Sequence, residues 1–501
     1  MTTVKVTFDS SSPEALSALK PRSDLLIEES SGDGTWTQTK GPFKSYSRSV
    51  VVDEQTGAVS QTVDFALDAP FWSFALTPLF KSSFKNEPKA ERSWWPTEVV
   101  SHKTVRIVSI LAFYSLMSGF LGALITAEIA FIGDDMGIAS SQQVDILAWT
   151  RIGIVISIFV LPLADRFGRK PLLAWVSVAA ITFTVFTSFF ENVAWIISTQ
   201  AIARAFITAM YSLSILAALE QVPKEWRARS ITAMTATAGI GIAISTLFLP
   251  LNDININLWR VPFIFSGILI FGVIYANRNL DETSRFVERE QTEQVEVKNT
   301  KFTAKDKRNL VLVGIVSFFA LFFSTPFSSV RNTFLEEEKG WTATEIGFFQ
   351  AGATIPAGIA LFLAGLLADR LGRKTIGITG LAMAIVFAGV AYSLPTFGLF
   401  TTTMISLIGS GLAFPAIYGY KSELFDTRIR SKANAYIDVL VVAGSGLGLL
   451  ATARLINIFN DSIGAAIGIL AIVSLPAVFV FSKYLPETAN RELEDLSSSE
   501  T

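Results

Sequence analysis

Two short segments of the chain repeat one pattern of acidic and basic residues. Residues 163–170 read Leu-Ala-Asp-Arg-Phe-Gly-Arg-Lys, and residues 367–374 read Leu-Ala-Asp-Arg-Leu-Gly-Arg-Lys. An Asp in a short loop at a helix terminus can accept backbone N–H bonds and can pair with a nearby Arg. Such pairs form and break without covalent chemistry. The repeat therefore indicates two related halves whose ion pairs change when the halves move against each other.

Two further charged patterns are also repeated. A Glu is followed by an Arg seven residues later at Glu220 and again at Glu423. Residues 281–285 (Asp-Glu-Thr-Ser-Arg) loosely match residues 486–494, which begin Pro-Glu-Thr. We predict that these charges form a gate; the alternative is that they only set the orientation of the chain in a membrane. The predicted gate residues are Asp165, Arg166, Arg169, Glu220, Arg227, Asp369, Arg370, Arg373, Glu423 and Arg430.

The composition is that of a membrane protein. Of the 501 residues, 50% are hydrophobic and 17% are charged, whereas a soluble protein carries about 25% charged residues. With no Cys and one His, the sequence excludes disulfides and thiol catalysis and offers no cluster of metal ligands. It also lacks a phosphate-cradling loop, and its formal net charge of −2 gives no sign of a nucleic-acid partner. We therefore expect no enzyme, no cofactor and no metal site.

The apolar residues occur in runs of about 20, the length that a helix needs to cross a bilayer. The twelve predicted spans are 107–130, 143–163, 172–190, 194–219, 230–250, 260–276, 309–333, 345–367, 375–393, 396–419, 432–458 and 463–484. A polar connector at 278–308 separates six spans from six. The predicted fold is an all-α membrane protein of 12 transmembrane helices in two pseudo-symmetric six-helix bundles, 105–277 and 309–485, followed by a cytoplasmic tail at 486–501.

Residues 1–95 differ from the rest and predict a small β-rich cytoplasmic domain. Apolar and polar residues alternate at Val4–Phe8 and again at Val59–Leu67, where only Gln61 breaks the pattern. The segment 53–57 (Asp-Glu-Gln-Thr-Gly) predicts a hairpin turn between strands. The apolar segment 70–80 has two interpretations: it lies on the membrane surface, or it packs on the small domain.

The distribution of Lys and Arg predicts the orientation. The loops after spans 2, 4, 8 and 10 are rich in these residues, whereas the opposite loops hold little beyond Arg260 and Lys339. The positive-inside rule then puts both termini in the cytoplasm. We expect a multi-pass protein of the plasma (inner) membrane.

The repeated motifs resemble those of the major facilitator superfamily (MFS), and the resemblance covers about residues 105–495. The family's loop pattern G-x-x-x-D-R-x-G-R-[KR] is complete from Gly365 to Lys374, while Leu161 replaces the leading Gly of the first copy. Residues 423–430 and 486–494 are similar to patterns of sugar porters and metabolite–proton symporters. The resemblance implies a transporter that works by alternating access, a gate that latches the cytoplasmic side, and a monomer.

Ionisable residues inside predicted spans are costly and usually functional. In the MFS, spans 1, 4, 7 and 10 normally line the cavity, which favours Glu128, Arg204 and Arg331. The alternatives are that Arg151 is a structural partner of Glu128, that Arg331 and Arg454 reach the outer surface, and that Asp438 belongs to the cytoplasmic network. The candidates for substrate binding or proton coupling are Glu128, Arg151, Arg204, Arg331, Tyr418 and Arg454.

The substrate class follows from what these residues can bind. Span 7 lacks the amide-rich signature of sugar porters, and span 5 lacks the Gly-Pro-rich motif of drug–proton antiporters. Four buried Arg candidates outnumber the acids Glu128 and Asp438, and Arg binds carboxylates bidentately. We expect symport of a small polar metabolite, an organic anion, with protons. Sugar transport, drug or metabolite efflux and a non-transporting membrane sensor are the alternatives.

Overall fold

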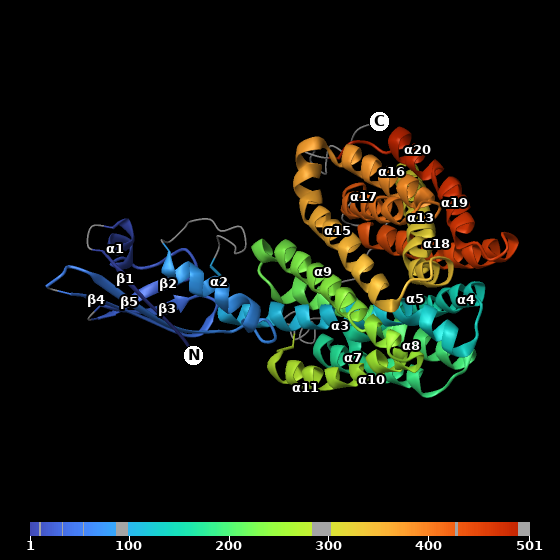
Figure 1. Cartoon of the computed structure of the whole chain (residues 1–501). Coiled ribbons are helices and arrows are strands. Elements are labelled where there is room, and N and C mark those ends of the chain that lie inside the picture. Colours follow the sequence, from blue (N-terminus) through green and yellow to red (C-terminus); the bar gives the residue numbers. More distant parts are fainter. Residues whose placement is uncertain are drawn as a thin grey trace.

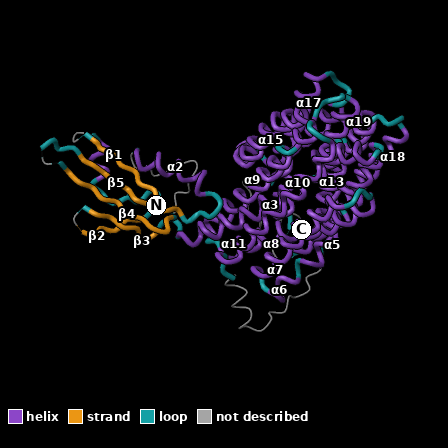
Figure 2. The backbone as a smooth tube through the Cα atoms, turned by 60° about the horizontal axis from the view of Figure 1, so that its bottom comes forward, coloured by secondary structure: helices purple, strands orange, loops and turns teal. Residues whose placement is uncertain are grey.

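The computed structural model describes residues 1–9, 12–32, 34–53, 55–86, 99–282, 302–425 and 429–488. Most of the predicted linker (283–301) and of the predicted tail (489–501) lies outside this part of the chain. Strands occur only in the N-terminal part of what is described, and a large helical body follows (Figures 1 and 2). The prediction of a β-rich N-terminal domain before an α-helical membrane protein is confirmed.

The N-terminal domain is one antiparallel sheet with the strand order β1-β5-β4-β3-β2. Its strands are β1 (Thr2–Phe8), β2 (Ile27–Gly32), β3 (Thr35–Lys40), β4 (Phe43–Val52) and β5 (Val59–Leu67). Gln61, which interrupts the apolar alternation of β5, lies on the buried face with its apolar neighbours. Its amide donates to the carbonyl of Phe84 at 3.1 Å, so the polar residue is satisfied there.

One face of the sheet is covered by the helices α1 (Pro13–Ala18) and α2 (Ser73–Lys85). Phe80 and Phe84 of α2 are fully buried and pack on aromatic rings of the sheet, whereas Phe74 on the outer face of α2 is 79% exposed. The second interpretation of the segment 70–80 therefore holds, because this helix packs on the small domain.

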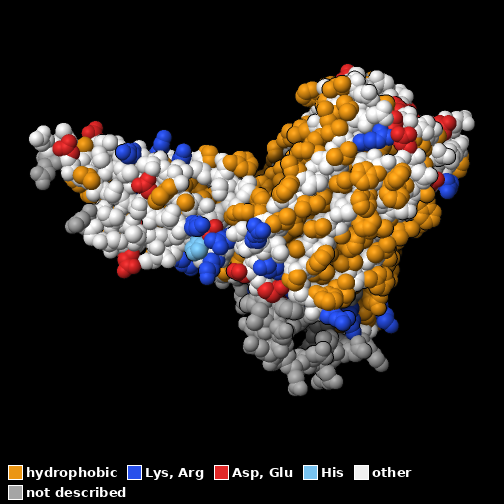
Figure 3. Space-filling view, turned by 90° about the horizontal axis from the view of Figure 1, so that it is seen from below, with side chains coloured by type: hydrophobic (Ala, Val, Ile, Leu, Met, Phe, Trp, Pro, Cys, Tyr) orange, Lys and Arg blue, Asp and Glu red, His pale blue; other side chains and the backbone are white. Residues whose placement is uncertain are grey.

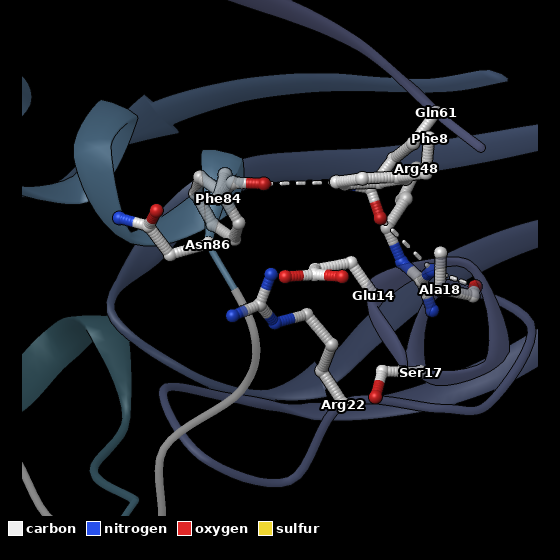
Figure 4. A pocket seen from close by; sticks show the side chains of 9 residues that line it. All are labelled: Phe8, Glu14, Ser17, Ala18, Arg22, Arg48, Gln61, Phe84 and Asn86. Atoms are coloured by element: carbon white, nitrogen blue, oxygen red, sulfur yellow. Dashed lines mark hydrogen bonds between the residues drawn. The ribbon is translucent and has the colours of Figure 1, made fainter. Parts of the chain in front are cut away.

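The interior of the β domain also contains a buried ion pair. The Arg48 guanidinium donates to Glu28 at 2.8 Å and to the carbonyl of Ala18 at 2.6 Å, and both charged side chains are fully buried. The adjoining cavity, shown with its hydrogen bonds in Figure 4, has a volume of about 10 Å³. A space of that size holds about one water molecule, so this part of the domain is filled by its own side chains.

The helical body consists of two groups of helices. The first contains α3 (His102–Met136), α4 (Ser140–Thr150), α5 (Ile152–Val160), α6 (Leu163–Phe167), α7 (Arg169–Phe186), α8 (Val193–Gln221), α9 (Lys224–Thr246), α10 (Arg260–Phe265) and α11 (Leu269–Asn279), with the short turns η1 (Thr187–Phe189), η2 (Leu249–Asp253), η3 (Ile256–Trp259) and η4 (Ser266–Ile268). The second contains α13 (Ala304–Ser329), α14 (Arg331–Thr333), η5 (Phe334–Glu338), α15 (Ala343–Leu371), α16 (Arg373–Ala391), α17 (Thr396–Glu423), α18 (Arg430–Ile458), α19 (Ile463–Ser474) and α20 (Pro476–Tyr484).

These helices have the lengths and surfaces of membrane spans. Among the described residues, 11 helices are long and apolar enough to cross a bilayer. The 29-residue helix α15 occupies the place of the predicted eighth span. Apolar side chains cover much of the outside of the helical body (Figure 3). The predicted fold class is confirmed.

Glycines bring equivalent helices close together in both bundles. A Cβ on Gly119 or Gly241 would collide with backbone carbonyls across the contact between α3 and α9. In the same way, Gly444 and Gly448 allow α18 to approach α13. Small residues permit such close packing in a bilayer, where helices gain little from hydrophobic burial. The matching positions reflect the pseudo-symmetry of the two halves.

We call the side of the bundles that carries the β domain and the two repeated loops the proximal side, and the opposite side the distal side. The helices α9 and α15 lie close at the distal side and diverge toward the proximal side (Figure 1). The helices α4 and α18 make a second contact between the bundles. The bundles therefore meet distally and separate proximally.

The segment 68–72 mounts the β domain on the first bundle. The Asp68 carboxylate accepts from Arg106 at 2.8 Å and contacts His102 at 2.8 Å, both on α3. The Phe71 ring stacks on Phe113 with 3.9 Å between centroids, and the Trp72 indole N–H donates to the carbonyl of Ser109 at 3.0 Å. Phe71 has a φ of 66°, a left-handed conformation that an aromatic residue adopts only where its surroundings enforce it. This contact therefore fixes the orientation of the β domain.

We expect Asp68→Asn to loosen this mount. Loss of a charge-assisted contact to a partly exposed Arg should accelerate amide hydrogen exchange in residues 68–72 and in the first turns of α3 by about fivefold to tenfold. The control is Asp64→Asn, on β5 four residues before Asp68, whose carboxylate accepts from Thr3 within the β domain at 2.5 Å. Equal exchange in both variants would show that Asp68 does not hold the domain.

Candidate functional site

The first repeated loop folds around the start of α7. Gly168 precedes this helix with a φ of 89°, a conformation that favours glycine. The Glu282 carboxylate accepts from the backbone N–H groups of Arg169 at 3.1 Å and Lys170 at 3.2 Å. The Arg169 side chain pairs with Glu220 of α8 at 3.1 Å, and both side chains are almost fully buried. Arg169 of the loop, Glu220 of α8 and Glu282 after α11 thus form one charge cluster.

The second loop repeats this arrangement at the start of α16. Gly372 has a φ of 92°, and the Glu487 carboxylate accepts from the N–H groups of Arg373 at 2.9 Å and Lys374 at 3.1 Å. The Arg373 side chain pairs with Glu423 of α17. An acid at a helix start satisfies N–H groups that have no partner within the helix and interacts favourably with the helix dipole.

The remaining predicted gate residues lie around these two clusters. Arg227 and Arg430 each donate to a backbone carbonyl five residues earlier, at 3.3 Å in both cases. Arg166 and Arg370 are exposed, and the side chains of Asp165 and Asp369 lie outside the described part of the structure. Within the described part, every ion pair of the two clusters joins residues of one bundle, in agreement with the proximal separation.

The bundles are joined on the distal side by a set of hydrogen bonds that the sequence analysis missed. Asn332 after α13 donates to the carbonyl of Ala127 on α3 at 2.9 Å. Glu337 accepts from Ser140 and from Gln143, the latter at 2.8 Å, both on α4. Asp253 accepts from the backbone N–H of Ala343 on α15 at 2.7 Å. We call these contacts the seam. The three consecutive Glu residues at 336–338 could have indicated it, but no partner for them is evident from the sequence alone.

Glu336 of the seam lies next to Asp134 at the end of α3. Burial first, and then the neighbouring carboxyl groups of Asp134, Glu337 and Glu128, raise the pKa of Glu336 to about 9. Burial also raises the pKa of Glu337. Glu336 is therefore neutral at pH 7, which avoids repulsion within a cluster that holds the two bundles together.

Of the candidates inside the spans, the structure brings Arg151 and Arg204 together. Arg151 lies at the break between α4 and α5, near enough to the Arg204 guanidinium of α8 for a direct electrostatic interaction. Within the described chain, neither guanidinium has an acidic partner, and the Arg151 Nε is buried without an acceptor. Glu128 is fully buried and accepts from Asn252 at 2.7 Å instead of pairing with Arg151.

Arg151 also borders a cavity between the bundles. This cavity has a volume of about 260 Å³ and is lined by apolar side chains of α4, α5 and α18, among them Trp149, Val155, Val442 and Leu447. A guanidinium beside an apolar cavity suits a small ligand with one anionic end and an apolar body. The position at the contact between bundles would let both halves touch such a ligand.

The other three candidates lie apart from this pair. Arg331 is only 6% exposed, and one of its nitrogens donates to Gln350 while two others have no partner in the described residues. Tyr418 is half exposed with the Lys421 ammonium 4.7 Å from its ring, and Lys421 pairs with Asp438. Arg454 is 64% exposed and pairs across the seam with Asp145 of α4 at 3.1 Å.

Comparisons with known proteins agree with this architecture. The family model described as Major Facilitator Superfamily matches residues 108–336 and 313–500. The chain is 25% identical over 412 residues to the cis,cis-muconate transport protein of Acinetobacter baylyi, covering 77% of this chain and 97% of that protein. It is 24% identical over 335 residues to the shikimate transporter of Escherichia coli, covering 59% and 73%. The inward-open xylose transporter of Escherichia coli has the same fold, with a TM-score of 0.67 at 17% identity over 79% of this chain and 99% of that one.

We expect Gly372→Ala to disrupt the second charge cluster. A side chain in this left-handed conformation costs about 1–2 kcal/mol, and its Cβ would lie 2.5 Å from a Glu487 oxygen. The thermal midpoint should fall by about 2–8 °C. The control is Gly358→Ala in α15, where a Cβ meets nothing within 4 Å. Similar losses in both variants would contradict a specific role for Gly372.

The pKa of Glu336 predicts how stability depends on pH. Between the ordinary value of 4.5 and about 9, the folded protein binds a proton that the unfolded chain has released, so stability falls as pH rises through this window and levels off above it. Glu336→Gln keeps the neutral shape and should make the fall of the thermal midpoint shallower. Asp461→Asn, in the turn after α18, serves as the control. Wild-type and Glu336→Gln slopes that coincide would refute the titration of Glu336.

Proposed function

Because the chain belongs to the Major Facilitator Superfamily, we propose that it is a secondary active transporter of small organic carboxylates, driven by proton symport. Arg151 and Arg204 bind the carboxylate, and the apolar wall of the adjoining cavity receives the body of the substrate. Alternating access exposes this site to one side of the membrane at a time.

The observation that carries the proposal is the pair of arginines without an acidic partner. A guanidinium inside a membrane protein is costly unless a counter-charge or a water-filled cavity stabilises it. Two neighbouring guanidinium groups also repel each other, so the site without substrate is electrostatically unfavourable. A carboxylate relieves both penalties, and Arg can hold it through two parallel hydrogen bonds.

The relatives support the choice of a carboxylate. The names of the aligned proteins from Acinetobacter baylyi and Escherichia coli specify cis,cis-muconate and shikimate, which are both organic acids. At 24–25% identity, the individual substrate of a relative is not assigned to this chain. The names agree with a site whose charge is positive, and we extend the substrate class, but not the compound, to this chain.

We further propose that the protein lies in the plasma (inner) membrane and that its proximal side faces the cytoplasm. The repeated loops on that side carry most of the basic loop residues, which the positive-inside rule places in the cytoplasm. The described conformation is then inward-facing. In the outward-facing state the two loops with Asp165 and Asp369 approach each other, and the gate charges that now pair within each bundle latch the proximal side.

A sugar transporter is the second candidate, because solved structures of a xylose transporter share the fold. At 16–17% identity these structures support the fold alone, and the unpaired arginines favour an anion. Proton coupling requires a carboxylate that exchanges protons during the cycle. Glu128, buried with one oxygen unpartnered among the described residues, is our candidate for that role.

We expect Arg204→Gln and Arg151→Gln to weaken carboxylate binding by about 10- to 100-fold, because each removes a charged hydrogen-bond donor. The measurement is the ligand-induced rise of the thermal midpoint in detergent with a panel of carboxylates and sugars, followed by uptake into liposomes under a proton gradient. The control is Arg278→Gln, an exposed arginine at the end of α11. Unchanged carboxylate binding in both variants, or a response to sugars alone, would rule out the proposed site.

A further inference from the structure

The start of α15 receives acceptors from two different bundles. Thr342 accepts from the N–H of Glu345 at 3.3 Å within the second bundle, which leaves the first two N–H groups of the helix to be satisfied. Asp253, which ends η2 of the first bundle, accepts from Ala343 at 2.7 Å and from Thr344 at 2.9 Å. The cap of this helix is therefore complete only while the two bundles touch.

The start of α4 also receives a carboxylate from the other bundle, although through side-chain donors. Its N-cap position is Ala139, which has no side chain that could accept a hydrogen bond. Glu337 of the second bundle lies at this helix start, where it accepts from the side-chain hydroxyl of Ser140 and the side-chain amide of Gln143 in the first turn. A carboxylate at this position is also favoured by the dipole of α4.

The two helices occupy equivalent places in the bundles, since each begins the second span and each leads to a repeated loop. We propose that Asp253 and Glu337 form a reciprocal distal latch that stabilises the inward-facing state. Each bundle supplies a carboxylate to the start of the other's second span: Asp253 caps the backbone of α15, and Glu337 binds side chains in the first turn of α4. The latch rests on the proposed function in one respect only: the two bundles must alternate between two states. Opening the distal side breaks both contacts and returns the N–H groups and carboxylates to water.

Other groups of the seam set the surroundings of this latch. Glu336 and Asp134 lie beside Glu337, and the exposed pair of Arg454 and Asp145 lies between α18 and α4. Asp253, bonded to two backbone N–H groups, has a fixed geometry that a side-chain pair lacks, because backbone donors cannot change rotamer. The latch therefore specifies a single distal arrangement of the bundles.

The natural absence of Cys allows a direct test by accessibility. Ala148→Cys places a thiol on α4 in the cavity between the bundles, and a membrane-impermeant maleimide then measures opening from the distal side. Asp253→Ala and Glu337→Ala should each accelerate labelling by about tenfold, the effect of losing a charged hydrogen bond.

The matched control is Glu345→Ala. Glu345 accepts from the N–H of Thr342 at 2.9 Å at the same helix start, but it belongs to the same bundle as α15. Labelling that rises with Asp253→Ala and not with Glu345→Ala supports the latch. Labelling that rises equally in both, or in neither Asp253→Ala nor Glu337→Ala, overturns it. The readout needs no substrate, so it is independent of whether the arginines bind a carboxylate.

A cross-link provides a second test if the alanine variants fail to fold. Asp253→Cys combined with Thr344→Cys should form a disulfide that stops transport, and reduction should restore it. Transport that continues at the normal rate in the cross-linked protein would show that this contact need not open, and the latch would be refuted.

Discussion

The first N–H groups of a helix have no partner within that helix, and where a helix start is buried the chain itself supplies their acceptors. Carboxylates do so at the starts of α7, α16 and α19, where Glu282, Glu487 and Glu338 each belong to the same bundle as the helix that they cap. At the start of α15 the acid is Asp253, which comes from the other bundle. This difference separates the caps that hold a bundle together from the cap that depends on how the bundles meet.

Arg151 and Arg204 depart from this satisfaction of charge within the described residues. The buried Arg48 of the β domain has Glu28, and the loop arginines Arg169 and Arg373 have Glu220 and Glu423. Arg151 and Arg204, both partly buried, have no such partner in the described chain. Arg331 also lacks an acidic partner among the described residues, but it donates to Gln350. Arg151 instead borders the cavity between the bundles and lies close to Arg204, which is why we propose this pair, and not Arg331, as the place for an anion.

The sequence was sufficient for the fold class because the signals are local: apolar runs have the length of a span, and the duplicated motifs mark equivalent loops. Glu220 and Glu423 were placed in the gate because their patterns repeat. Asp253, Glu337 and the partner of Glu128 were missed, since their contacts join segments far apart in the chain and depend on how the bundles approach. Asn252 offered no signal at all, because a lone Asn near the end of a span has no characteristic spacing.

The mount of the β domain limits how that domain can influence the helices. Asp68, Phe71 and Trp72 contact α3 and α11 of the first bundle, and the left-handed backbone at Phe71 persists because these contacts enforce it. The domain therefore moves with the first bundle, and its distance from the second bundle changes whenever the proximal side opens or closes. Its described interior is filled by aromatic rings and the Arg48–Glu28 pair. Any influence on the helices must therefore act through its surface or through the mount on α3.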